Sequence, residues 1–212
     1  MKLLLINPIL PELFSRAHSL PYGYLTSDAW LTKHGHEVDL LFPEQHLWRG
    51  PQILDYIDKN RPDMIGMGGF FDWLNVAAHL SFLIRQRFPD IKQIFGGIMA
   101  SPNPELCFKI APIDYVCCGE GEIALQQLLD ALDTGESTED IQGICYMEHG
   151  RFVDRGTGEP VNLDELPEFN WDKINMAHYA FNWQLKSPLF PYQFPLGFFM
   201  ISRGCPYNCN FP

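Results

Sequence analysis

Over the first 134 residues, short continuous apolar runs alternate with longer segments whose apolar residues recur at helical spacing. A continuous apolar run is typical of a strand buried on both faces, as in a parallel sheet. Strands are predicted at 2–7, 36–42, 63–67, 91–95 and 114–118. Helices are predicted at 22–33, 51–60, 72–88, 104–110 and 123–132. This alternation indicates an α/β fold, in which helices cover both faces of a five-stranded parallel sheet.

The order of these elements is that of the Rossmann-like class, and more narrowly of flavodoxin-like sheets. The longest helix carries apolar residues at a spacing that we expect to face the sheet: Leu74, Ala77, Ala78, Phe82 and Leu83. After position 134 the pattern changes. Residues 141–154 alternate in polarity on either side of His149-Gly150, which predicts a β-hairpin.

Three of the five predicted strands end in glycine: Gly66, Gly68 and Gly69, then Gly96 and Gly97, then Gly119 and Gly121. A glycine at a strand end can simply form a turn. Glycine also lets the backbone approach a bulky ligand, and open parallel sheets bind ligands beyond the carboxyl ends of their strands. The repetition favours a ligand ledge. Neither the dinucleotide fingerprint nor the P-loop pattern occurs, so a dinucleotide or a P-loop nucleotide is not expected.

Charge and composition narrow the class of protein. The net charge of −11 argues against a nucleic-acid-binding surface, which needs clustered lysines and arginines. There is no apolar run of about 18 residues, so no membrane span is expected. The six cysteines lack the spacing of a disulfide framework and indicate the reducing cytoplasm. Cys107, Cys117, Cys118 and Cys145 are predicted to be buried thiols, and no histidine spacing indicates a zinc site.

The C-terminal segment contains two cysteines three residues apart, Cys205 and Cys209, after an apolar run. A third cysteine at position 212 would complete the spacing CxxxCxxC, but Pro212 stands there. Cysteine thiolates hold iron–sulfur clusters, and their spacing is the main signature in sequence. The two cysteines are therefore candidate ligands of an incomplete iron–sulfur site.

The residues around these cysteines, Ser-Arg-Gly-Cys-Pro-Tyr-Asn-Cys-Asn-Phe, resemble the cluster loop of radical S-adenosylmethionine enzymes. The N-terminal part resembles the cobalamin-binding domain that precedes the barrel in one large class of these enzymes. The matching segments are 3–8, 31–38, 61–66, 87–97 and 113–122. The resemblance implies a cobalamin-binding domain at 1–134, a hairpin and inter-domain linker at 135–195, and the start of a truncated (β/α) barrel at 196–212, with its first strand at 196–202.

In that family, cobalamin lies across the strand ends. Carried over, Gly66, Gly68, Gly69, Gly96 and Gly97 would line the slot for the nucleotide tail. Asn7, Pro8, Gly119, Glu120 and Gly121 would approach the corrin ring. The D-x-H-x-x-G motif, whose histidine ligates cobalt in related domains, is absent. His18 lies in the corresponding loop, but its neighbours do not match, and an exposed loop histidine is the simpler interpretation. We therefore expect no protein ligand beneath cobalt.

Glu120 and Glu122 have two interpretations: they polarise a ligand, or they stabilise the positive end of the following helix.

The resemblance implies an N-terminal cobalamin-binding portion of a cobalamin-dependent radical enzyme, a methyltransferase or a catalyst of a related transformation. In that class a [4Fe-4S] cluster binds S-adenosylmethionine, an electron donor protein supplies the electron, and the cofactors carry the difficult chemistry. With most of a barrel missing, this chain is expected to be inactive alone. Two alternatives stay open: a domain that kept the fold but lost cobalamin, and a truncated, non-enzymatic binding module. The substrate is not predicted.

Overall fold

A computed structural model describes residues 1–8, 20–179 and 202–204, and its centre is one sheet of seven strands in the order β2-β1-β3-β4-β5-β6-β7. The strands are β1 (Lys2–Ile6), β2 (Glu37–Leu41), β3 (Met64–Met67), β4 (Lys92–Phe95), β5 (Tyr115–Cys117), β6 (Ile144–Glu148) and β7 (Arg151–Val153). The first five pair in parallel, which confirms the predicted flavodoxin-like sheet.

The strand order reverses at β1, which pairs with β2 on one side and with β3 on the other. The chain therefore leaves β1 in one direction to form β2 and continues in the opposite direction from β3 onwards. Helices that follow β1 and β3 must then lie on opposite faces, and a crevice opens between them at the carboxyl ends of the strands.

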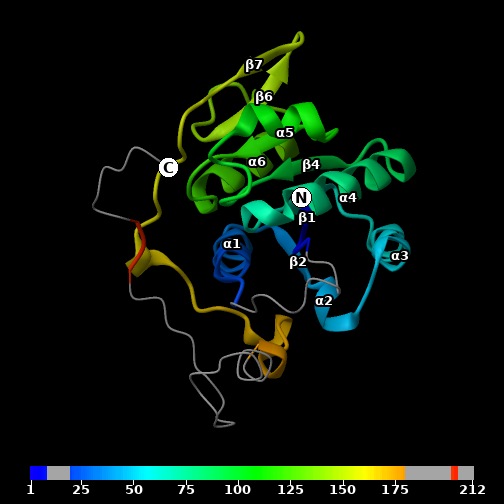
Figure 1. Ribbon diagram of the computed structural model, residues 1–212. Coiled ribbons are helices and arrows are strands. Elements are labelled where there is room, and N and C mark those ends of the chain that lie inside the picture. The colour runs from blue at the N-terminus through cyan, green and yellow to red at the C-terminus, as the bar shows by residue number, and fades with distance from the viewer. Residues whose placement is uncertain (9–19, 180–201, 205–212) are drawn as a thin grey trace.

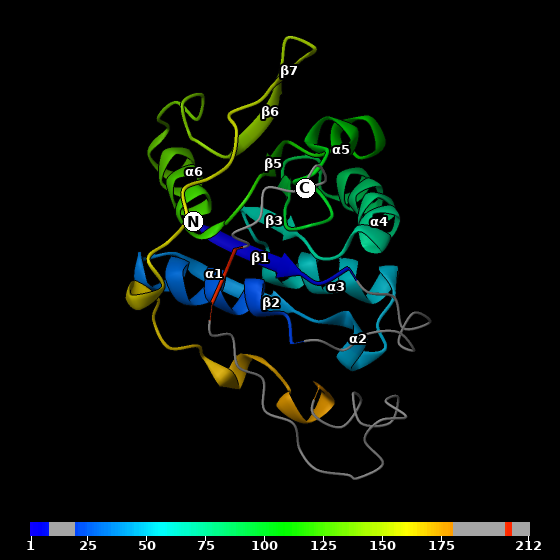
Figure 2. The ribbon, with the colours of Figure 1, turned by 60° about the vertical axis from the view of Figure 1, so that its left-hand side comes forward.

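The α-helices that accompany the sheet are α1 (Tyr22–Lys33), α2 (Pro43–His46), α3 (Gly50–Asn60), α4 (Leu74–Arg87), α5 (Pro104–Ile110) and α6 (Glu122–Thr134). Helices α1 and α6 lie side by side on one face, where the Trp30 indole nitrogen donates to Gln126 Oε1 at 2.9 Å. Helices α3, α4 and α5 cover the other face (Figures 1 and 2).

Each face has its own apolar core. On the α3/α4/α5 face, Ile65, Met67 and Phe95 from the strands pack with Ile57 and Ile84 from the helices. On the α1/α6 face the core includes Leu3, Leu5, Met64 and Ile94 with helix residues such as Leu128. Successive strand residues point to opposite faces, so the continuous apolar runs of the sequence supply both cores at once.

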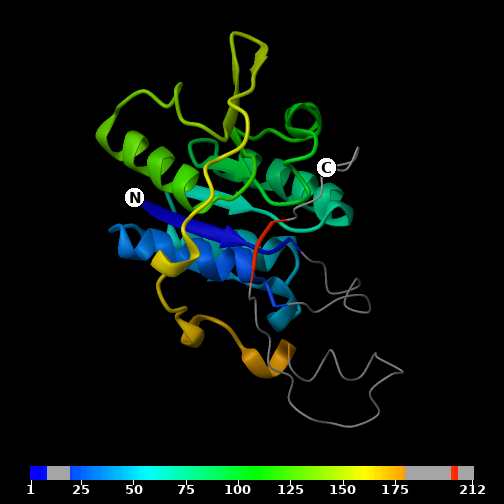
Figure 3. The same ribbon diagram turned by 90° about the vertical axis from the view of Figure 1, so that its left-hand side faces the viewer.

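The chain that follows the hairpin returns along α1 and the edge strand β2 (Figure 3). Its anchor is Lys173, whose Nζ lies 2.6 Å from Oδ1 of the buried Asp28 and also donates to the Val38 carbonyl. Ile174 and Tyr179 complete a third apolar cluster with Leu25 and Phe42. This path brings residues 163–179 to the α1 side of the domain.

Several expectations need correction. Phe82 does not face the sheet: 49% of it is exposed. The buried stripe of α4 runs through Leu74, Ala77, Ala78, Ser81 and Ile84. At 100° per residue the stripe passes through Ser81, which leaves Phe82 at its side. Leu83 is only partly buried.

The short helix α2 was not predicted, because four residues after a proline show no helical period. The hairpin was predicted, but β6 also pairs antiparallel with β5 and extends the sheet. The expected barrel strand at 196–202 lies outside the described residues except for Ser202.

Candidate functional site

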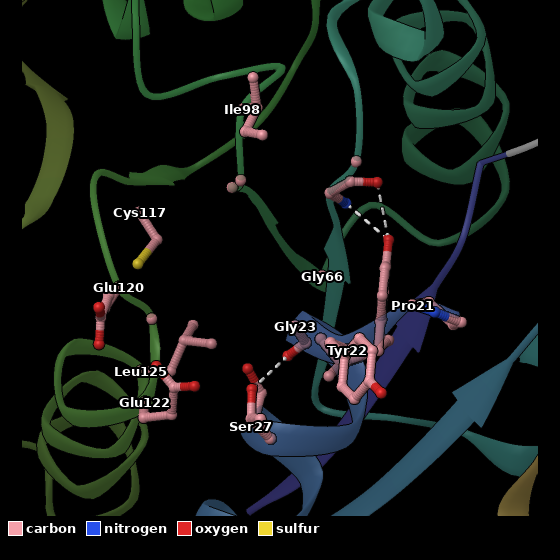
Figure 4. A pocket seen from close by; sticks show the side chains of 18 of the residues that line it. Pro21, Tyr22, Gly23, Ser27, Gly66, Ile98, Cys117, Glu120, Glu122 and Leu125 are labelled. Carbon is pink, nitrogen blue, oxygen red and sulfur yellow. Dashed lines mark hydrogen bonds between the residues drawn. The ribbon is translucent and has the colours of Figure 1, made fainter. Parts of the chain in front are cut away.

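A cavity of about 650 Å³ opens at the carboxyl edge of the sheet, on the α1/α6 face. Figure 4 shows Glu120, Glu122 and Leu125 on one side of it and Tyr22, Gly23 and Ser27 on the other. The strand alternation explains the space. Gly66 and Gly96 are the positions of β3 and its neighbour that point toward this face. The Leu5 side chain packs over Gly66, where a Cβ would lie 2.6 Å from Leu5 Cδ2, whereas a Cβ on Gly96 would have its nearest neighbour at 3.7 Å.

Two glycines of the cavity wall hold neighbouring strand ends together. A Cβ on Gly68 would lie 3.3 Å from the Gly96 carbonyl oxygen, and one on Gly97 would lie 3.1 Å from the Gly69 nitrogen. Gly97 also has a φ of +67°, which L side chains rarely adopt. The backbones after β3 and β4 therefore touch directly and form a ledge without side chains.

Gly96 and Gly121 are different. A Cβ at either position would meet only ordinary van der Waals contacts, the nearest at 3.7 Å for Gly96 and 3.4 Å for Gly121. Gly121 has an ordinary helical conformation, with φ −93°. Nothing inside the fold demands glycine at these two positions, although both line the cavity.

After β5, three glycines mark a crossing of main chains. A Cβ on Gly119 would collide with Thr157 Cγ2, one on Gly143 with the Gly158 backbone, and one on Gly158 with the Glu120 carbonyl. The crossing brings the segment behind β7 across the end of β5, where the Gly158 nitrogen donates to the Cys118 carbonyl at 2.8 Å. Gly119 thus has a packing role in addition to its place on the cavity wall.

Tyr24 of α1 ties the ends of β1 and β3 together at the point where the strand order reverses. Its hydroxyl accepts from the Gly68 N–H at 2.9 Å and has the carbonyls of Ile6 and Gly68 as acceptors, each at 2.8 Å. Burial raises the pKa of Tyr24 above its ordinary value, so the hydroxyl keeps the proton that it donates. This single side chain satisfies backbone groups that the sheet leaves unpaired.

Beyond β1, Asn7 belongs to a buried polar cluster. The Asn7 amide nitrogen donates to Glu44 Oε1 at 3.0 Å, and the Tyr179 hydroxyl donates to the same oxygen at 2.9 Å. Burial raises the pKa of Glu44, which is 1% exposed. Within the part of the chain that the structure describes, Asn7 Oδ1 has no hydrogen-bond partner, although Asn7 lines the cavity. A buried acceptor without a donor marks a place where a ligand N–H would be stabilised.

Arg203 closes the third side of the site. Its Nη1 lies 2.9 Å from Glu122 Oε1 and 3.2 Å from Glu120 Oε2, and Ser202, Arg203 and Gly204 all line the cavity. The first turn of α6 has no side-chain cap, so the structure favours neither of the two roles expected for these glutamates. Both pair with an arginine that follows them by about eighty positions.

Nine of the ten residues predicted to bind cobalamin lie around this one cavity; the tenth, Pro8, is not among the lining residues. Whether they contact the cofactor stays a prediction. Cys205, Cys209 and His18 lie outside the described residues. Sequence reasoning missed the side chains that line the opposite wall or close the site: Leu20, Tyr22, Tyr24, Ser27, Leu125 and Arg203. Only Arg203 carried a signal, since it stands inside the cysteine motif.

The four described cysteines are buried thiols, as predicted. Cys117 faces the cavity, and burial raises its pKa to about 12, so it carries no charge near neutral pH. Cys118 points to the opposite face, where its sulfur lies 3.6 Å from that of Cys145. Among the described residues no group of His, Cys, Asp and Glu side chains could hold a metal ion, and no helix is long and apolar enough to cross a bilayer.

The fold and the position of the cavity define a ligand-binding domain of the doubly wound class, and comparison with known proteins identifies it further. Residues 18–129, more than half of the chain, match the family model of the B12 binding domain. The chain therefore belongs to the B12-binding domain family.

Two curated relatives align with the whole chain. An uncharacterized methyltransferase, PH0819, of Pyrococcus horikoshii is 28% identical over 219 residues, which are 100% of this chain and 45% of that protein. The anaerobic magnesium-protoporphyrin IX monomethyl ester cyclase of Synechocystis sp. is 23% identical over 217 residues, 100% of this chain and 42% of that protein. The chain thus spans less than half the length of these relatives.

Among solved structures, the cobalamin-dependent S-adenosylmethionine radical enzyme OxsB, with aqua-cobalamin and S-adenosylmethionine bound, superimposes with a TM-score of 0.73. The match has 23% identity and covers 84% of this chain and 25% of that one. The likeness confirms the Rossmann-like fold. Together with the family match, it confirms the resemblance to radical S-adenosylmethionine enzymes that carry an N-terminal cobalamin-binding domain.

The residues of the cavity fit a cobalamin. The Gly68–Gly97 ledge lets a large planar group approach the backbone, and the lining is mostly apolar. The corrin edge carries amide groups, which are the donors that Asn7 Oδ1 lacks. No cavity-lining residue within the described segments is a histidine.

Proposed function

We propose that the cavity between α1 and α6 seats cobalamin, and that this chain is the cobalamin-binding portion of a radical S-adenosylmethionine enzyme. The observation that carries the proposal is the ledge of Gly66, Gly68, Gly96 and Gly97 at the strand-order reversal, inside a segment that matches the B12-binding family. Methyl transfer is the activity that the name of the Pyrococcus relative supports, and the description of OxsB as a radical enzyme supports a related radical transformation.

In this proposal each part of the chain has a binding task. Gly96 leaves room for the tail in the crevice, and Ile94 and Leu125 exclude water from it. Asn7 Oδ1 accepts an amide N–H of the corrin edge, while Glu44 fixes the orientation of the Asn7 amide. Cobalamin itself supplies a methyl carrier when bound. We expect no protein side chain to ligate cobalt, since no histidine lines the cavity within the described segments.

The whole protein would need parts that lie outside the described residues. Cys205 and Cys209 are the candidate ligands of a [4Fe-4S] cluster that binds S-adenosylmethionine, with an electron donor protein as partner. The free thiols agree with a reducing, cytoplasmic location.

Reconstitution with hydroxocobalamin tests the proposal. The wild-type chain is expected to keep the visible absorbance of the corrinoid after desalting. Gly121→Trp places an indole over Cys117 without backbone strain and should lower retention at least tenfold, because the ring fills the crevice. Gln86→Trp, on the exposed surface of α4, is the matched control and should bind like the wild type.

Loss of absorbance from the wild-type chain after desalting would contradict the proposal. That result would favour the alternative in which the domain kept its fold but not its cofactor. Retention by both tryptophan variants would place the corrinoid elsewhere on the protein.

A further inference from the structure

The link between the cavity and the cysteine segment is one side chain, Arg203, which stands two residues before Cys205. Its side chain is 16% exposed and pairs with two carboxylates, that of Glu122, the first residue of α6, and that of Glu120, two residues earlier. Among the described residues, no other contact of segment 202–204 with the sheet domain is an ion pair. Arg203 is therefore the electrostatic attachment of this segment.

The two carboxylates differ in burial, and this difference gives the attachment its strength. Glu122 is 3% exposed, so its charge needs a partner. The N-terminus of α6 supplies part of the stabilisation, and Arg203 supplies the opposite full charge. Glu120 is more exposed and also accepts from the Val161 nitrogen at 3.3 Å. Glu120 thereby joins the segment behind the hairpin to the same arginine.

The position of the segment gives this attachment a consequence for the cavity. Ser202 and Gly204 line the cavity together with Arg203, opposite the ledge of strand ends. In Figures 2 and 3 the short coloured piece 202–204 lies across the carboxyl side of the sheet, next to α1 and β1. A ligand in the crevice would have this piece of chain as one of its walls.

We propose that Arg203, Glu120 and Glu122 form a latch that holds residues 202–204 against the cavity as one wall of the cobalamin site. Arg203 is a positioning residue in this scheme. The inference rests on the proposed function for the identity of the ligand, but the attachment itself does not depend on any ligand.

The first measurement uses the ligand-free 212-residue chain and follows amide hydrogen exchange of residues 202–204. Arg203→Gln should raise the exchange rate of these amides about tenfold or more, because it leaves the buried charge of Glu122 unpaired. Glu122→Gln should raise it less, because Arg203 keeps its second partner, Glu120. Arg203→Lys should restore part of the protection. Arg87→Gln is the matched control, since Arg87 also bridges two carboxylates, Asp55 and Asp58, but lies away from the cavity.

The second measurement follows the loss of bound hydroxocobalamin after dilution into competitor. The off-rate should rise about tenfold in Arg203→Gln, a factor that corresponds to about 1.4 kcal/mol. The off-rate of the double variant Arg203→Gln/Glu122→Gln should be no higher than that of the faster single variant, because the two substitutions remove the same interaction. Glu120→Gln removes the exposed partner only and serves as the milder test if Glu122→Gln does not fold.

The outcomes separate the two proposals. If exchange at 202–204 is the same in the wild type and in Arg203→Gln, the latch is wrong whatever the cofactor does. If the wild type fails to retain hydroxocobalamin but its exchange depends on Arg203, the latch stands and the proposed function fails. If the corrinoid is retained and its off-rate is unchanged in every latch variant, the segment is attached but is no wall of the site, and the inference is overturned.

Discussion

The two faces of the sheet receive side chains from the same strands, yet only the α3/α4/α5 face is filled up to the carboxyl edge. On that face the last positions of β3 and β4 carry Met67 and Phe95, both buried. On the α1/α6 face the corresponding positions are Gly66 and Gly96, and a cavity remains. Both faces have an apolar core, but at the carboxyl edge packed side chains fill the first face, whereas polar contacts surround the cavity on the second.

The comparison teaches how a binding site can be made without weakening the sheet. Because neighbours along a strand point to opposite faces, one position can be glycine while the next is large. Packing on the α3/α4/α5 face compensates for the apolar contacts that the cavity removes from the α1/α6 face. Hydrogen bonds of Tyr24 and the ion pairs of Arg203 replace apolar contacts where the cavity begins.

The sharpest test of this contrast compares the same substitution on the two faces. Ile65, on β3, is fully buried on the filled face, and Ile94, on β4, is 2% exposed and lines the cavity. Isoleucine-to-alanine changes in cores cost about 2–5 kcal/mol. In urea-induced unfolding, we expect Ile65→Ala to lower the free energy of unfolding by an amount near the upper end of this range. Ile94→Ala should lower it by an amount near the lower end.

The same pair separates stability from binding. Ile94→Ala should raise the dissociation constant for hydroxocobalamin, while Ile65→Ala should leave it unchanged as long as the chain is folded. Equal losses of unfolding free energy would mean that the two faces are packed alike, and the contrast would be wrong.

A smaller effect is expected from Tyr24→Phe. The variant leaves the partly buried Gly68 N–H without its acceptor, which costs about 1 kcal/mol, the lower end of the penalty for a buried donor. Tyr22→Phe is the matched control, because the Tyr22 hydroxyl is buried and has no hydrogen-bond partner within the described residues. The midpoint of thermal unfolding should therefore fall in Tyr24→Phe and hardly change in Tyr22→Phe. An equal fall in both variants would show that the Tyr24–Gly68 hydrogen bond does not stabilise the fold.

The smallest effect is a change in pH dependence. Because burial raises the pKa of Glu44, the folded state keeps this proton at pH values where the unfolded state has lost it. The wild-type free energy of unfolding should thus fall as pH rises from about 4.5, the ordinary glutamate value, through the raised pKa of Glu44. Glu44→Gln removes this decline.

Unfolding by urea at several pH values measures this difference. Glu105→Gln, on the surface of α5, removes one negative charge without touching the buried cluster and is the control. If the unfolding free energies of wild type and Glu44→Gln run parallel over the whole range, Glu44 does not titrate as proposed.

Much of the fold could be predicted because it depends on local periodicity. Helices α1 and α5 begin and end where the sequence places them, and every strand from β1 to β5 was found within two residues at each end. The strand-end glycines could be placed at one edge for the same reason: parallel strands share their carboxyl side.

The rest depends on contacts between distant segments, which periodicity does not contain. Arg203 meets Glu120 and Glu122 across about eighty residues, and Tyr24 meets Gly68 across forty-four. The pairing of β6 with β5 likewise follows from the crossing at Gly143 and Gly158, and the hairpin pattern gave no sign of it.

The crossing of main chains at Gly119, Gly143 and Gly158 determines which glycines homologous domains must retain. At Gly119, Gly143 and Gly158 one added methyl group strikes another part of the protein, so a lineage must keep these glycines whether or not it still uses the vitamin. At Gly96 and Gly121 an added methyl group would make only ordinary van der Waals contacts, so the fold does not require glycine there. In a homologue, larger residues at these two positions would indicate that its lineage no longer binds the cofactor.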